Sequence, residues 1–154
     1  MRDERSFADA VFCLGSEVNV RSCNSPRTLI MLSIRGTYEA GDILQDLKFE
    51  QASFDGRFGA KVHRGFMQQF EGIKQRALSF IDNALKKDRN IDEILITGHS
   101  LGGAIAAMLG VLVSEKYQER TTRVVTFGSP TPGNIEFQRL FNSRKDFLSQ
   151  VLRK

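Results

Sequence analysis

Residues 97–104 read TGHSLGGA, and within them Gly98, Ser100 and Gly102 fit the pattern G-x-S-x-G. This pattern is typical of a nucleophile elbow, a sharp turn between a strand and a helix that carries an exposed serine. A side chain at either glycine would collide with the backbone of so tight a turn. The pattern therefore predicts that Ser100 is a nucleophile at the junction of a strand and a helix.

The flanking sequence has the composition that such an elbow requires. Residues 92–97, DEILIT, end in an apolar run rich in β-branched side chains, which predicts a buried strand. Residues 101–117 repeat apolar side chains at helical spacing, and their small residues leave one side of the helix free to lie close to a sheet. The N-terminus of this helix would favour negative charge at the serine. The alternative is an ordinary strand–turn–helix unit in which Ser100 does nothing.

Strand-like and helix-like segments alternate along the rest of the chain. The predicted strands cover residues 17–21, 28–34, 93–97, 123–127 and 147–152, and the predicted helices cover residues 66–86, 101–117 and 135–141. This alternation predicts an α/β fold with a mostly parallel sheet and helices on both faces. A chain of 154 residues with 41% hydrophobic content can bury one core, so we expect a single domain over residues 1–154.

Charge and hydropathy predict neither nucleic-acid binding nor a transmembrane segment. The formal net charge is +4, and the basic clusters at residues 86–89 and 144–145 are short and separated, as on solvated faces. No stretch approaches the ~18 consecutive apolar residues of a membrane helix. The N-terminal sequence MRDERSFADAVF is charged and has no adequate apolar core for a signal peptide, which favours an intracellular location.

Cysteine and histidine positions predict no metal site. Cys13, Cys23, His63 and His99 are the chain's only residues of these types, and their spacing does not match a zinc site. Without an export signal, two free thiols are favoured over a Cys13–Cys23 disulfide, which a secreted protein could form. The glycine-rich elbow lacks the Lys-Ser/Thr of a P-loop, and no cofactor is predicted.

Four motifs, taken in order, resemble those of the class 3 (fungal-type) lipase family of α/β-hydrolases. They are IRGT at 34–37, VHRGF at 62–66, ITGHSLGGA at 96–104 and TFGSPTPGN at 126–134. Ile34 replaces the family's Phe, and Thr131 and Pro132 depart from its Arg-Val. The resemblance implies an α/β-hydrolase-like fold and hydrolysis of a carboxylic ester through a Ser100 acyl-enzyme.

The tetrahedral oxyanion of that reaction needs hydrogen-bond donors. The backbone N–H of Leu101, the residue after the nucleophile, is the expected first donor. The resemblance supplies the second at Thr37, through its N–H and its hydroxyl; otherwise Thr37 is a strand-end residue whose hydroxyl caps a local turn. The resemblance also implies a short amphipathic lid at residues 38–47, and a permanently packed surface helix is the alternative for this segment.

No residue of the chain is recognisable as the base or acid of a catalytic triad. His99 adjoins the elbow serine and should point away from its hydroxyl, and the resemblance makes His63 structural, at the start of the long helix. In the family an Asp follows the Gly-Asn motif by roughly twenty residues, beside a Val-Pro pair, and a His comes later. Only 20 residues follow Asn134, and Asp146 comes too early. We therefore expect that the chain stops before these two residues and lacks the C-terminal part of the fold.

Three functions fit the sequence. The first is a carboxylic-ester hydrolase of the lipase type, acting on a lipid or other ester at a lipid–water interface and poorly active without the base and acid of the triad. The second is a non-catalytic descendant of the fold that binds lipid or a partner. The third is a related acyltransferase or thioesterase with the same elbow.

Overall fold

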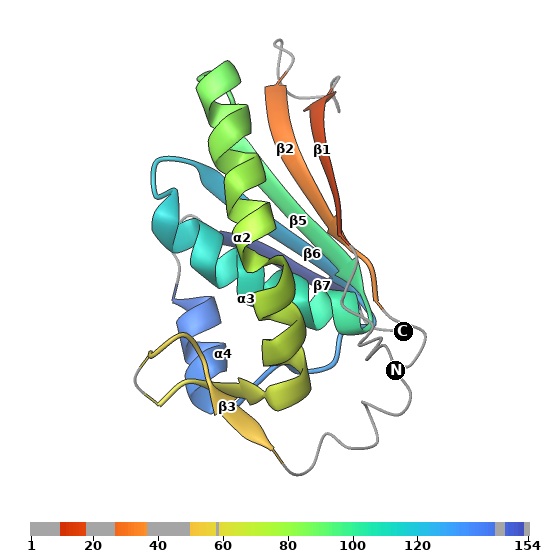
Figure 1. Ribbon diagram of the computed structural model, residues 1–154, viewed down its shortest axis with the longest axis vertical. Coiled ribbons are helices and arrows are strands. Elements are labelled where there is room, and N and C mark those ends of the chain that lie inside the picture. The colour runs from red at the N-terminus through yellow and green to blue at the C-terminus, as the bar shows by residue number, and fades with distance from the viewer. Residues whose placement is uncertain (1–9, 18–26, 37–49, 58, 144–146, 153–154) are drawn as a thin grey trace, which may run out of the picture.

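Five strands form one sheet in the order β1-β2-β5-β6-β7 (Figure 1). The computed structural model describes residues 10–17, 27–36, 50–57, 59–143 and 147–152. The strands of the sheet are β1 (Ala10–Glu17), β2 (Arg27–Ile34), β5 (Glu93–His99), β6 (Thr121–Phe127) and β7 (Phe147–Leu152). β1 runs antiparallel to β2, and the other three pairings are parallel, so the predicted mostly parallel sheet is confirmed.

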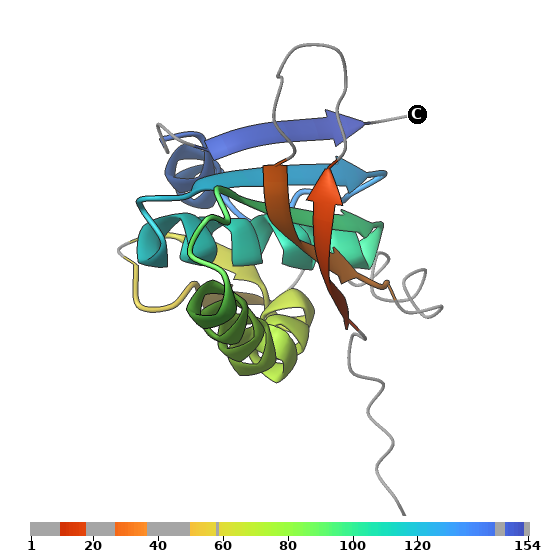
Figure 2. The ribbon, with the colours of Figure 1, turned by 90° about the horizontal axis from the view of Figure 1, so that it is seen from above.

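The three helices that the structure describes lie on one face of this sheet (Figures 1 and 2). They are α2 (Arg64–Lys87), α3 (Leu101–Lys116) and α4 (Ile135–Asn142). α3 packs on β5 and β6, and α2 packs on α3. Because α3 lies between the sheet and α2, it is buried on nearly every side, and the small residues predicted to allow this contact are all buried. These residues are Gly103, Ala104, Ala106 and Ala107.

The two faces of the sheet differ in burial. Along β2, Ile30, Leu32 and Ile34 are buried beneath the helices, whereas Met31 and Ser33 between them are half-buried. β5 and β6 show the same alternation. The α/β prediction is therefore confirmed, but helices were expected on both faces and the described helices cover one. Strands covered on both faces are buried continuously, and these strands alternate instead.

Most predicted elements are confirmed, and two regions differ from the prediction. The first strand was predicted at residues 17–21, whereas β1 ends at Glu17 and the apolar run before that residue pairs with β2. No strand was predicted for the hairpin of β3 (Gln51–Ser53) and β4 (Lys61–His63), which forms a second sheet. Strands of three residues are too short to show a hydrophobic period.

Several predictions fall outside the described residues. These concern the proposed lid at 38–47, Thr37, Cys23 and Asp146. Cys13 lies on β1, but its side chain is not described, so the thiol state of the two cysteines stays a prediction. In the part of the chain that the structure covers, no helix is both long enough and apolar enough to cross a membrane.

Candidate active site

Ser100 lies between the end of β5 and the start of α3, as predicted. Its backbone has φ 53° and ψ −124°, a strained conformation for a residue with a side chain. The Ser100 N–H donates to the Phe127 carbonyl oxygen at 2.9 Å, and the Ser100 carbonyl oxygen accepts from the Gly103 N–H at 2.9 Å. Hydrogen bonds on both sides of the residue therefore hold the strained turn in place.

Backbone contacts explain the two glycines of the elbow. A Cβ atom at Gly98 would lie 2.3 Å from the Gly102 carbonyl oxygen, and one at Gly102 would lie 2.2 Å from the Ile34 carbonyl oxygen. Both neighbours are main-chain atoms of packed elements, which cannot move aside as a flexible side chain can. The spacing G-x-S-x-G therefore reflects the close backbone packing of β2, β5 and α3 at the elbow.

The end of β2 reaches the start of α3. Ile34 pairs with Gly98 in the parallel register of β2 and β5. A Cβ atom at Gly36 would lie 3.0 Å from the His99 carbonyl oxygen and 3.7 Å from the Leu101 nitrogen. The IRG segment therefore approaches the amide predicted as the first oxyanion donor. Thr37, the predicted second donor, follows directly but lies outside the described residues.

The hydroxyl of Ser100 does not cap the helix that follows it. Serine is among the strongest helix N-cap residues, because its oxygen can accept from the free N–H groups of the first turn. Here the side chain is half-buried and makes no cap hydrogen bond. Within the described residues, no hydrogen bond joins it to His63 or to His99.

The two histidines occupy different environments. His63 caps α2, because its Nδ1 accepts from the Gly65 N–H at 3.2 Å, and its ring packs on Phe66 with centroids 4.9 Å apart. The predicted structural role of His63 at the start of the long helix is confirmed. His99 is exposed, and its Nε2 lies 3.7 Å from the position of a Cβ atom at Gly128.

Asn134 joins the β3–β4 hairpin to α4, a role that the sequence analysis missed. Its side-chain oxygen accepts from the N–H groups of Lys61 and Phe137, each at 3.0 Å, and its side-chain nitrogen donates to the Gly59 carbonyl oxygen at 2.8 Å. A Cβ atom at Gly133 would lie 2.2 Å from the Lys61 carbonyl oxygen. The Gly-Asn pair of the fourth motif therefore has a structural role. The sequence could have indicated the N-cap role of Asn134, because an Asn directly before a short amphipathic helix is typical of a cap residue.

Ion pairs join the β3–β4 hairpin to α2 and α3. Arg57 forms ion pairs with Asp55 and with Glu115 of α3. Lys74 of α2 donates to Asp55 at 2.9 Å, and this hydrogen bond holds the pKa of the Asp55 carboxyl below its usual value. Among the described residues, no group of three His, Cys, Asp or Glu side chains could hold a metal ion.

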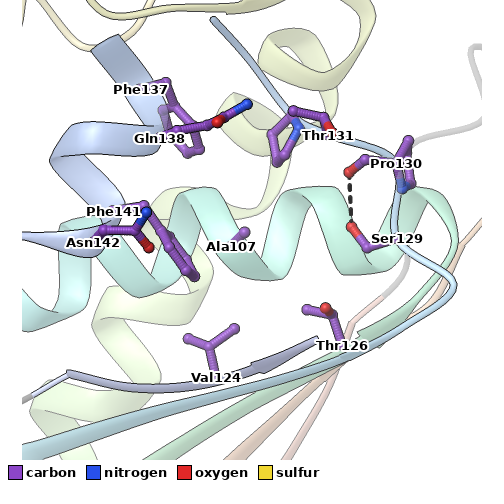
Figure 3. A pocket seen from close by; sticks show the side chains of 11 residues that line it. Ala107, Val124, Thr126, Ser129, Pro130, Thr131, Phe137, Gln138, Phe141 and Asn142 are labelled. Atoms are coloured by element: carbon purple, nitrogen blue, oxygen red, sulfur yellow. Dashed lines mark hydrogen bonds between the residues drawn. The ribbon is translucent and has the colours of Figure 1, made fainter. Parts of the chain in front are cut away.

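A cavity of about 210 Å³ lies beside α3, between β6, α4 and the loop that joins them (Figure 3). No residue lining it was predicted to form a site. The described residues that line it are Ala107, Val124, Thr126, Ser129, Pro130, Thr131, Pro132, Phe137, Gln138, Phe141 and Asn142. Such a cavity depends on how four elements pack together, so no local pattern in the sequence could indicate it.

Comparisons with known proteins match the chain to a lipase family and to several lipases. The family described as Lipase (class 3) matches residues 31–154. A lipase of Rhizopus niveus is 29% identical over 111 residues, which cover 70% of this chain and 28% of that protein. A secreted mono- and diacylglycerol lipase of Fusarium solani is 26% identical over 136 residues, covering 84% of this chain and 40% of that protein.

The fold agrees with this result. The crystal structure of a lipase from Rhizopus microsporus var. chinensis superposes with a TM-score of 0.71 at 26% identity, covering 80% of this chain and 44% of that one. The chain thus spans less than half the length of each of these three lipases.

Proposed function

This chain belongs to the class 3 lipase family, and we propose that it is the nucleophile-bearing part of a carboxylic-ester hydrolase that acts on lipid esters. In the proposed reaction the Ser100 oxygen attacks the ester carbonyl carbon and its proton passes to a base. The alcohol then leaves, and water hydrolyses the acyl-enzyme to release the acid.

The backbone of Ser100 is the observation that carries this proposal. A left-handed φ of 53° is costly for serine, yet the serine hydroxyl makes no cap hydrogen bond that would offset the cost. Backbone strain that no local hydrogen bond of the side chain offsets is typical of residues in active sites. The half-buried Ser100 also lies at the carboxyl end of a parallel strand, β5. Open α/β sheets bind their ligands at this end of the strands.

We propose the Leu101 and Thr37 N–H groups as the two oxyanion donors. The close approach of Gly36 to the Leu101 nitrogen supports this pairing, because Thr37 follows Gly36 directly in the sequence. One such donor is worth on the order of 10²–10³ in kcat. The start of α3 adds its helix dipole to the same charge.

The proposed base is neither of this chain's histidines. The Nδ1 of His63 is occupied by the Gly65 N–H, and His99 lies beside Gly128. A serine hydrolase without its base loses on the order of a million-fold in kcat. We therefore expect the 154-residue chain to hydrolyse nitrophenyl esters barely above background.

A fluorophosphonate probe tests the proposal on the 154-residue chain, with added imidazole as a substitute base. We expect weak labelling of the folded chain, an increase with imidazole, and none of either in the Ser100→Ala variant. Ser114→Ala is the matched control, because Ser114 lies in the same helix and its hydroxyl donates to the Val111 carbonyl oxygen.

Three results would count against this assignment. Labelling that persists in the Ser100→Ala variant would remove Ser100 as the nucleophile. Strong labelling without imidazole that is lost in His63→Ala or His99→Ala would identify the base within this chain. A folded chain that imidazole does not activate would favour the non-catalytic descendant.

A further inference from the structure

The cavity beside α3 is suited to a small apolar group. Ala107 of α3, Val124 of β6, and Phe137 and Phe141 of α4 supply apolar side chains that face it (Figure 3). Its volume is about 210 Å³. A dry cavity of about 150 Å³ holds benzene, which has six carbon atoms. By this comparison the cavity accepts a chain of about six to eight carbons.

One buried polar group faces the cavity without a partner. Thr126 is only 2% exposed, yet in the described part of the chain its hydroxyl makes no hydrogen bond. Unlike the sealed hydroxyl of Thr122 on the same strand, the Thr126 hydroxyl is open to the space of the cavity, where a bound molecule can reach it. Figure 3 shows this hydroxyl directed from β6 toward the space beneath the loop. A ligand hydroxyl in the cavity would satisfy it.

The charge of the lining limits the ligand further. No Asp, Glu, Lys, Arg or His is among the described residues that line the cavity. Gln138 and Asn142, both exposed, supply uncharged amides at its edge. An ionised group inside would lose its hydration with no opposite charge to replace it. The described lining of the cavity therefore favours an uncharged ligand.

We propose that this cavity is a binding site for a neutral alcohol with one chain of about six carbons, whose hydroxyl bonds to Thr126. The site is distinct from the Ser100 elbow. The two regions adjoin through Ser129, which lines the cavity and packs against Gly103 in the first turn of α3. Binding does not depend on Ser100 acting as a nucleophile.

Hexan-1-ol is the probe, and its binding to the ¹⁵N-labelled chain is followed by NMR titration. We expect saturable shifts at amides around the cavity, with a Kd on the order of 0.1–1 mM for so small a ligand. The Ser100→Ala chain should bind equally well, which separates this test from that of the proposed function. Hexanoate, with the same chain and a negative charge, should bind at least about tenfold more weakly.

Two threonines of β6 provide a matched pair of variants. Thr122 lies on the same face of the same strand, is fully buried and also has an unpartnered hydroxyl, but does not line the cavity. Thr126→Val should weaken hexan-1-ol binding about tenfold, the effect of one lost hydrogen bond, and Thr122→Val should leave it unchanged. Ala107→Leu, which fills the cavity, should abolish binding.

The proposal is overturned if hexan-1-ol does not saturate, if hexanoate binds as tightly, or if the two threonine variants behave alike. Retained affinity in a folded Ala107→Leu chain would also overturn it. The valine variants preserve side-chain shape, so they decide the matter even where Ala107→Leu does not fold.

Discussion

Two of the three described helices begin with a side-chain cap, and α3 does not. The N-cap residue is His63 for α2 and Asn134 for α4, and the side chain of each accepts a hydrogen bond from the first turn. Their backbone angles are ordinary, with φ of −59° and −72°. The N-cap position of α3 is Ser100, whose φ is 53° and whose hydroxyl makes no cap hydrogen bond. Serine is among the residue types best able to cap a helix, yet Ser100 occupies an N-cap position without making the cap hydrogen bond.

This difference separates a helix start that stabilises the fold from one that presents a side chain. At Asn134 every polar atom of the side chain has a protein partner. At Ser100 only the main chain is fixed, by Phe127 and Gly103, and the side chain is left available. Substitutions at the two sites should therefore affect stability in opposite directions.

The largest effect is expected at Gly102. Its replacement by Ala would bring a methyl group against the Ile34 carbonyl oxygen, at 2.2 Å in the present geometry. We expect Gly102→Ala to lower the free energy of unfolding by more than about 3 kcal/mol, at or above the usual range for overpacking. Urea denaturation measures the loss. Gly72→Ala, at an exposed position within α2, should instead raise stability by about 1 kcal/mol.

A smaller loss is expected when the capped start of α4 is altered. Asn134→Ala removes three side-chain hydrogen bonds that join α4 to the hairpin. We expect a loss of about 2 kcal/mol in the free energy of unfolding. Asn83→Ala, at an exposed position of α2, is the control and should cause no loss. Equal effects of the two substitutions would show that the Asn134 contacts contribute little.

The smallest effect should have the opposite sign. Ser100→Gly removes the side chain that makes a positive φ costly, and no side-chain cap is lost. We expect the folded state to gain about 1 kcal/mol, less than the full strain because glycine is more flexible when unfolded. Asn134→Gly should be destabilising in the same denaturation assay. A loss of stability in Ser100→Gly would contradict the distinction between the two kinds of helix start.

The sequence predicted the elements whose reasons are local. The glycine spacing around Ser100 indicated the elbow, and apolar periodicity indicated the helix that begins next to His63. It did not predict the reach of Asn134 to Lys61, which is 73 residues away in the chain, or the cavity that Thr126 faces. These depend on which elements meet in space, and a single sequence carries no direct record of that.

The parallel pairing of β2 with β5 has a consequence for how the chain folds. Ile34 and Gly98 are partners in this pairing, although the hairpin and the whole of α2 separate them along the chain. The chain must lose the entropy of closing this long loop before the contacts between β2 and β5 can form. Folds dominated by such distant pairings therefore fold slowly. The elbow is completed only when β2 arrives. Until then β5 has an open edge, and a nascent chain would be vulnerable there to association with other chains.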